Sequence, residues 1–174
     1  MFRSILSLGV MSALALCVSQ GAEAASSFPN GSTSLTEAYH DWSLSCHVEN
    51  EKKQCVVSQQ AFDSKTRQRF FSIQFRPQGE QIRGVALLPF GLDLPRGMTL
   101  ITDGLPVGDI YSFTTCLPEG CVVPLDLDEG QLGGLVKSKK AALSFTSISG
   151  QVMKLPLSTN GLQQALARAH VVMR

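Results

Sequence analysis

The chain has 174 residues, 44% of them hydrophobic and 17% charged, with a formal net charge of +1 at pH 7. It contains no internal repeat and no low-complexity tract, which excludes a repeat protein. Once an N-terminal signal is removed, about 150 residues remain. A chain of that length forms one domain of ordinary size and buries about two-thirds of its unfolded surface.

Residues 1–24 are predicted to be a secretory signal peptide that is removed from the folded protein. Arg3 gives a positive start, residues 5–18 are mostly apolar, and Ala22-Glu23-Ala24 matches a small-x-small cleavage site. The apolar run is shorter than the roughly 20 residues that a membrane-spanning helix needs. No later segment is apolar enough to cross a membrane, so we expect an exported, soluble mature chain.

The folded domain is expected to span residues 40–174, after a flexible leader over the Ser- and Thr-rich residues 25–39. It begins with a predicted β-hairpin. Apolar and polar residues alternate from Trp42 to Val48, with Trp42, Leu44 and Cys46 on one side, as in a half-buried strand. A polar turn over residues 49–53 leads into a second strand.

Short apolar segments separated by turn residues follow through the middle of the chain. Asp103-Gly104 is typical of a two-residue hairpin turn. Residues 128–136 could form a helical turn or a loop, and Gly133-Gly134 argue against a long helix there. Pro156 cannot donate to a strand ladder, which predicts an edge strand. The further strands are predicted at residues 71–75, 85–90, 98–102, 107–117, 121–125, 143–146 and 153–157.

The C-terminal end has a different period. Residues 158–160 offer helix caps, and Leu162, Ala165, Leu166 and Ala169 repeat at helical spacing. We expect an amphipathic helix of about three turns that packs Leu162 and Leu166 into the core. Many short strands and one terminal helix predict an all-β fold, a single β-sandwich or barrel-like domain of mostly antiparallel strands.

Four cysteines remain after the signal peptide. An even number in an exported chain predicts two disulfides in an oxidising compartment. Three pairings are open, and we favour Cys46–Cys55 with Cys116–Cys121 because each pair flanks a turn. Loops this short stabilise a fold by about 2–3 kcal/mol each in the chain-entropy model. The spacings match neither a common zinc site nor a thioredoxin-like redox motif.

No catalytic, cofactor-binding or metal-binding site is predicted. His40, His47 and His170 share no ligand spacing, and the common hydrolase and phosphate-binding motifs are absent from the sequence. Basic residues beside aromatic ones at residues 67–71 fit nucleic-acid binding weakly, and a secretory signal argues against such a partner.

Acidic residues gather between positions 103 and 129. Asp126-Leu-Asp128-Glu129 resembles the start of a calcium loop, but Gln131 and Lys137 stand where the loop needs glycine and glutamate. A spaced pair of these carboxylates could serve a glycoside hydrolase. Charge is arranged in blocks: residues 92–130 carry a net charge of −6, whereas residues 131–174 carry six basic groups and no acid. If this C-terminal block forms a surface, it could attract anionic envelope polymers or lipids.

Several of these features together resemble the invasion-associated locus B family. The resemblance covers about residues 40–170. It departs from the family at Leu162, where a Phe usually follows the glycine. The segments that carry it are Trp42-x-Leu44-x-Cys46, Cys55-x-Val57-x-Gln59, Leu88-Pro89-x-Gly91-Leu92-x-Leu94, Phe113-x-x-Cys116-x-Pro118-x-Gly120-Cys121 and Gly161-Leu162-x-x-Ala165.

The resemblance implies an exported, mostly β protein of the bacterial envelope, with disulfides at the matched cysteines and Trp42 in the core. Some members are linked to invasion of host cells, notably erythrocytes, and no active site is established for the family. We therefore expect a non-enzymatic envelope protein, in the periplasm or on the outer surface, that binds a protein or polymer partner and contributes to host-cell invasion or envelope integrity. The alternatives are an envelope hydrolase that acts on wall or surface glycans through carboxylates in 103–129, and a periplasmic chaperone with exposed apolar sheet edges.

Overall fold

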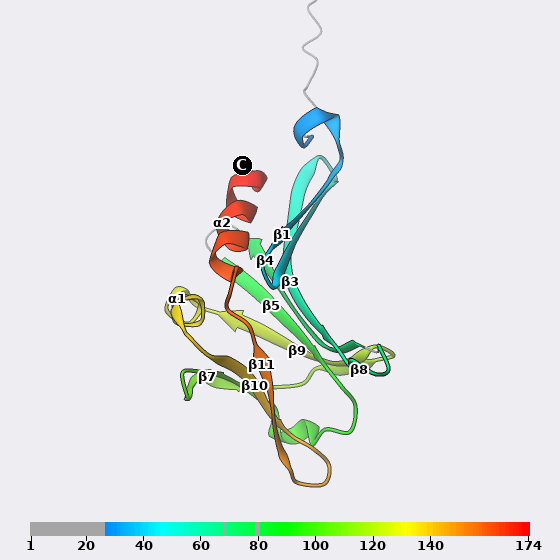
Figure 1. Ribbon diagram of the computed structural model, residues 1–174, viewed down its shortest axis with the longest axis vertical. Coiled ribbons are helices and arrows are strands. Elements are labelled where there is room, and N and C mark those ends of the chain that lie inside the picture. Colours follow the sequence, from blue (N-terminus) through cyan, green and yellow to red (C-terminus); the bar gives the residue numbers. More distant parts are fainter. Residues whose placement is uncertain (1–26, 68, 79–80) are drawn as a thin grey trace, which may run out of the picture.

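The computed structural model describes residues 27–67, 69–78 and 81–174 (Figure 1), so the predicted signal peptide lies outside the described residues. Its strands form two antiparallel sheets, and the all-β prediction is confirmed. The seven-stranded sheet has the order β1 (Ser34–Tyr39), β2 (Trp42–Glu49), β3 (Lys52–Phe62), β4 (Arg69–Gln78), β5 (Gln81–Leu88), β9 (Gly120–Leu127) and β8 (Thr115–Leu117). The four-stranded sheet has the order β11 (Val152–Leu157), β10 (Ala141–Thr146), β6 (Met98–Thr102) and β7 (Leu105–Tyr111).

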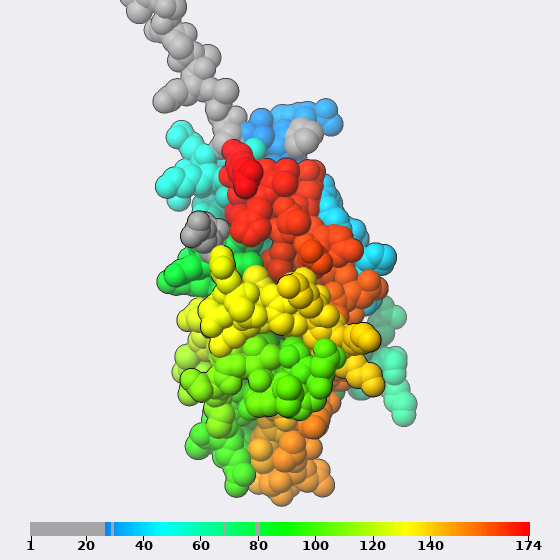
Figure 2. Space-filling view, turned by 90° about the vertical axis from the view of Figure 1, so that its left-hand side faces the viewer, coloured from blue at the N-terminus to red at the C-terminus, as the bar shows by residue number. Residues whose placement is uncertain are grey.

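Two α-helices and two short 3-10 turns complete the described fold. Helix α2 (Leu162–Met173) packs on β1 to β4, whereas α1 (Glu129–Lys137) contacts β7 and β9. The 3-10 turns cover Pro29–Gly31 and Leu94–Arg96. Figure 2 shows α2 in red above α1 in yellow on one face of the molecule, with the β10–β11 turn in orange at the lower end. A single hydrophobic core includes residues of both sheets and of both helices.

The predicted hairpin is present as β2 and β3. Trp42, Leu44 and Cys46 are buried, whereas Ser45 and His47 on the opposite side are exposed. The two-residue turn at Asp103-Gly104 is also confirmed, since Thr102 pairs directly with Leu105. Pro156 lies on β11, which is an edge strand as predicted.

Strand β1 corrects the prediction of a flexible leader over residues 25–39 at Ser34–Tyr39, whereas residues 25 and 26 lie outside the described residues. Its six residues pair with β2 along their whole length, from Ser34 opposite His47 to Tyr39 opposite Trp42. Leu35, Glu37 and Tyr39 are half-buried, and Phe28 before the strand is 4% exposed. The segment was missed because only one of its inward residues is aliphatic, so its alternation is weak in hydropathy.

Helix α1 settles the open choice between a helical turn and a loop. The Asp128 carboxylate accepts the Gln131 N–H at 2.8 Å, and the Gln131 side chain accepts the Asp128 N–H at 3.1 Å. This reciprocal capping box starts a nine-residue helix in spite of Gly133 and Gly134. The acidic segment that resembles a calcium loop therefore begins a helix.

Helix α2 buries Leu162, Ala165, Leu166 and Ala169, as their spacing predicts, and Val172 as well. Its predicted cap among residues 158–160 is wrong. The N-cap is Gly161, at φ +93°, and it makes no side-chain capping bond. The Ser158 hydroxyl does not cap the helix and instead donates a hydrogen bond to the side chain of Asp41, which lies before β2.

Candidate functional site

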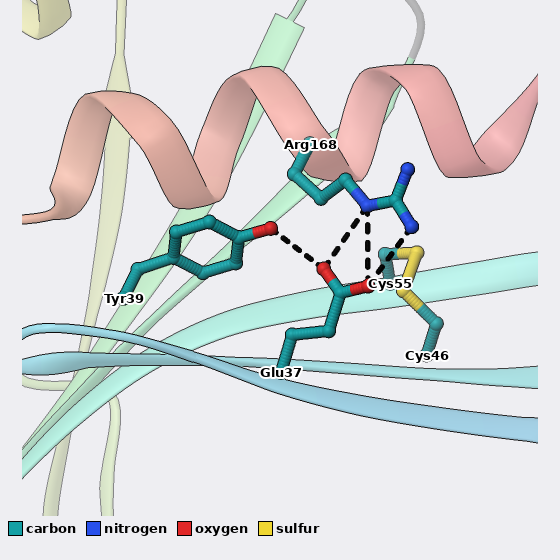
Figure 3. The surroundings of a disulfide bond; sticks show 5 residues. All are labelled: Glu37, Tyr39, Cys46, Cys55 and Arg168. Carbon is teal, nitrogen blue, oxygen red and sulfur yellow. Dashed lines mark hydrogen bonds and ion pairs between the residues drawn. A yellow bond between two sulfur atoms is a disulfide. The ribbon is translucent and has the colours of Figure 1, made fainter.

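The two disulfides of the structure are Cys46–Cys55 and Cys116–Cys121. Each joins two residues that lie directly opposite one another in neighbouring strands. The first is buried beneath α2 (Figure 3), whereas Cys116 of the second is exposed. Both therefore cross-link hairpins.

An ion pair beside the first disulfide fixes α2 to the edge strand β1 (Figure 3). Arg168 of α2 donates to both carboxylate oxygens of Glu37, with Nη2 to Oε1 at 2.9 Å and Nε to Oε2 at 3.0 Å. The Tyr39 hydroxyl donates to the same carboxylate at 2.6 Å. The Arg168 hydrogen bond and then the Tyr39 hydrogen bond lower the pKa of Glu37, because both stabilise the charged carboxylate.

This cluster predicts a pH-dependent part of the stability. Because the pKa of Glu37 is lowered on folding, its contribution is fully present above the ordinary value of 4.5 and is lost as the pH falls through the lowered folded pKa. Urea unfolding should show Glu37→Gln less stable than wild type at about pH 7, with the difference shrinking towards about pH 3. The exposed turn residue Glu119 supplies the control, because Glu119→Gln should have little effect at either pH. A Glu37→Gln deficit that is unchanged at the lower pH contradicts this assignment.

Three residues around the hairpin converge on Ser158, at the end of β11. Trp42 Nε1 donates to the Ser158 carbonyl oxygen at 2.9 Å. Gln59 binds both backbone groups of Ser158: its Nε2 donates to the carbonyl at 3.2 Å, and its Oε1 accepts the N–H at 3.0 Å. The Ser158 hydroxyl donates to Asp41 Oδ2 at 2.6 Å. These bonds attach the edge of the smaller sheet to β2 and β3 of the larger sheet.

A cleft of about 870 Å³ lies at this junction. Its volume falls within the range of small-molecule sites. Gln59, Ser158 and Asp41 form one side, and the apolar lining includes Phe71 and Leu157. The remaining lining comes from Gln60, Ala61, Lys139, Lys140, Ala141, Ala142, Lys154 and Pro156.

The lysines give this cleft a positive charge. Lys139, Lys140 and Lys154 are exposed, and none of their ammonium groups has an ion-pair partner within the described ranges. Asp41 is the only acidic residue in the lining, and Ser158 already donates to its Oδ2. The lining of the cleft therefore carries a net positive charge.

The loop that carries two of these lysines is held on both sides. The Asp103 carboxylate accepts the backbone N–H groups of Lys139 at 3.1 Å and Lys140 at 3.0 Å. The Thr159 hydroxyl donates to the Ser138 carbonyl at 2.9 Å. The backbone beneath the two lysines is thus fixed before any ligand binds, which lowers the entropic cost of binding.

The carboxylates proposed for a hydrolase are spread over turns and strand ends. Asp103 holds the lysine loop and Asp128 caps α1. A second cavity, of about 520 Å³, is lined by Asp126, Asp128 and Glu129, together with Gln81, Ile82, Arg83 and Leu127 and no aromatic residue. Among the described residues, no group of three or more His, Cys, Asp or Glu side chains could hold a metal ion.

None of the three histidines lines either of these two cavities. His40 lies in the β1–β2 turn, His47 lies 3.7 Å from Glu49 on β2, and His170 lies in the last turn of α2. The described part of the chain contains no helix that is long and apolar enough to span a membrane.

The fold and these motifs agree with a known family. The family model described as "Invasion associated locus B (IalB) protein" matches residues 42–170. The chain belongs to the IalB family. The matched range includes the hairpin, every residue of the cleft lining except Asp41, and most of α2, whereas β1 lies before it.

Relatives with this family name share most of the chain. It is 35% identical over 146 residues to the "Invasion protein B homolog" of Brucella abortus (strain 2308), which covers 83% of this chain and 84% of the relative. It is 33% identical over 119 residues to "Invasion protein B" of Bartonella bacilliformis, covering 68% and 63%. The crystal structure of invasion associated protein b from Bartonella henselae superposes with a TM-score of 0.74 at 25% identity, covering 79% of this chain and 96% of that one.

Proposed function

We propose that this IalB-family protein is an exported, non-enzymatic component of the bacterial cell envelope that acts by binding an anionic partner in the lysine-lined cleft. The observation that carries the proposal is the set of three ammonium groups without ion-pair partners, in the described residues, around a cleft of about 870 Å³. The two disulfides support export, because such bonds persist in oxidising compartments. Three relatives named as invasion proteins or their homologs support a contribution to host-cell invasion or envelope integrity.

Binding fits the described structure better than the two alternatives. The cavity with Asp126 and Glu129 has no aromatic platform, and its third carboxylate is committed to a helix cap. On the edge strand β11, exposed Lys154 and Pro156 discourage the strand addition that a chaperone would use, whereas Val152 of β11 and Leu105 and Ile110 of the edge strand β7 are exposed apolar residues.

Export and location can be tested together. The protein recovered from envelope fractions should have the intact mass expected for loss of residues 1–24 and formation of two disulfides. We expect a protease added to intact cells to leave it undigested and to degrade it once the outer membrane is permeabilised, with a known periplasmic protein as the control.

Two outcomes would change the proposal. Full-length protein with free thiols in the cytoplasm would contradict export. Digestion in intact cells would place the protein on the outer surface, and direct contact with host cells would then become the preferred role.

A further inference from the structure

We propose that the ligand of the lysine-lined cleft is an anionic amphiphile, a lipid whose phosphate group lies among the lysines while part of its apolar chain lies on the cleft floor. This inference rests on the proposed function and names the chemistry of its ligand. It follows from where charge and apolar surface lie within one cavity.

The charged groups come from two segments that meet at the edge of the smaller sheet. Lys139 and Lys140 immediately precede β10, whereas Lys154 lies on β11 opposite Ser144 of β10. Ser144 lies four positions after Lys140, which corresponds to about 13 Å along an extended strand. The cationic groups therefore flank a strip of sheet rather than crowd at one point.

The strip between them is apolar. Ala142 and Pro156 are a directly opposed pair of β10 and β11. They lie two residues from Ser144 and Lys154, so they share a face of the sheet with Lys154. The lysine side chains can lay their methylene stems on this surface and bring their ammonium groups to one anion above it.

The other wall of the cleft extends the apolar surface. Ala61 at the end of β3 and Phe71 of β4 line it, and Leu157 of β11 also belongs to the lining. The Phe71 and Leu157 side chains are each 3% exposed, so the floor that a ligand can cover comes mainly from Ala61, Ala142 and Pro156. Three cations beside the accessible apolar surface of Ala61, Ala142 and Pro156 match a ligand that has both a negative head and an apolar body, whereas a free anion would leave that surface uncovered.

The side chains of Gln60 and Ser158 complete the polar end of the cleft. Ser158 already donates its hydroxyl to Asp41, so the lysines remain the principal groups for a phosphate. Lysine binds phosphate as a compact point charge through up to three donors. Such contacts tolerate different headgroups, and we expect the cleft to select for charge more than for headgroup shape.

The test uses short-chain lipids that stay monomeric in solution, with the mature protein from which residues 1–24 have been removed. Isothermal titration should show binding of dihexanoyl phosphatidylglycerol, and much weaker binding of dihexanoyl phosphatidylcholine and of glycerol phosphate. The first comparison removes the net negative charge from the ligand, and the second removes its apolar chains.

A matched pair of variants locates the site. Lys139→Gln, Lys140→Gln and Lys154→Gln together should weaken dihexanoyl phosphatidylglycerol binding about tenfold or more, because all three cationic contacts to the phosphate are lost at once. The triple change Lys52→Gln, Lys65→Gln and Lys137→Gln removes the same charge outside the cleft, and it should leave the affinity within about twofold. All six lysines are exposed, and only Lys137 lies in a helix, so both variants should fold.

Four outcomes would overturn the inference. Equal binding of glycerol phosphate would indicate a free-anion site, and equal binding of phosphatidylcholine an apolar groove in which the lysines are incidental. Equal weakening by both variants would indicate an effect of net charge alone. Absence of binding to any of the three ligands, with heparin bound instead, would indicate a polyanion site. None of these results touches the export test, so the lipid inference and the envelope role can fail separately.

Discussion

Replacing Gly161 by Ala is expected to destabilise the protein by about 2 kcal/mol or more. Gly161 is the N-cap of α2 and has a φ of +93°, a region that costs a residue with a side chain about 1–2 kcal/mol. A Cβ atom at this position would also overlap the backbone carbonyl oxygen of Tyr39 in β1. A backbone group in a paired strand cannot move aside as a flexible side chain can. The free-energy cost of the positive φ and the cost of the Cβ overlap therefore add.

Equilibrium urea unfolding followed by circular dichroism measures this effect. Gly133→Ala is the matched control, because Gly133 lies inside α1 and a Cβ there would meet nothing within 4 Å. Because alanine has a higher helix propensity than glycine, the Gly133→Ala variant should be as stable as wild type or up to about 1 kcal/mol more stable. Equal urea midpoints for wild type and Gly161→Ala would show that α2 does not need the close approach to Tyr39.

The elements that the sequence predicts well are those in which hydropathy repeats with a clear period. The alternation from Trp42 to Val48 fixes β2, and the spacing of Leu162, Ala165, Leu166 and Ala169 fixes the buried side of α2. Both patterns are local, and neither depends on a distant partner. They also account for why the strand order as a whole could not be predicted, since alternation says which side of a strand is buried but not which strand lies beside it.

Strand β1 was missed for a related reason. Its central inward residue is Glu37, whose half-buried position depends on Arg168, 131 positions away. A hydropathy pattern predicts that such a residue is exposed, because the residue that compensates its charge does not lie in the neighbouring sequence. The ion pair also explains why a count of six basic groups after residue 130 overstates the free positive charge there.

The cleft was only partly predictable. The C-terminal charge block was compatible with either a solvated surface or attraction of anionic polymers or lipids, and the sequence did not show that Lys139, Lys140 and Lys154 share one cavity. A signal for the junction was nevertheless present at Gln59. A glutamine on the buried side of a strand, 7% exposed, needs hydrogen-bond partners in the interior. Its partner, the backbone of Ser158, is what brings β11 to the edge of the cleft.

Replacing Trp42 by Ala is expected to lower the free energy of unfolding by about 3–5 kcal/mol, the range for truncating a buried aromatic residue. The side chain is 1% exposed and stacks on Phe75, with ring centroids 5.7 Å apart. Two contributions are lost together: the packing of the indole and its hydrogen bond to the Ser158 carbonyl. Urea unfolding measures their sum, and a second variant separates them.

Trp42→Phe keeps an aromatic ring over Phe75 but removes the N–H donor. The Ser158 carbonyl would still accept from Gln59 Nε2 at 3.2 Å, so no buried acceptor is left without a partner. We therefore expect Trp42→Phe to be clearly more stable than Trp42→Ala, with a deficit of about 1–2 kcal/mol relative to wild type. If the two variants were equally unstable, the hydrogen bond to Ser158 rather than the ring's packing would hold the sheets together. The remaining bonds from Gln59 and to Asp41 would then be too weak to keep Ser158 beside the hairpin.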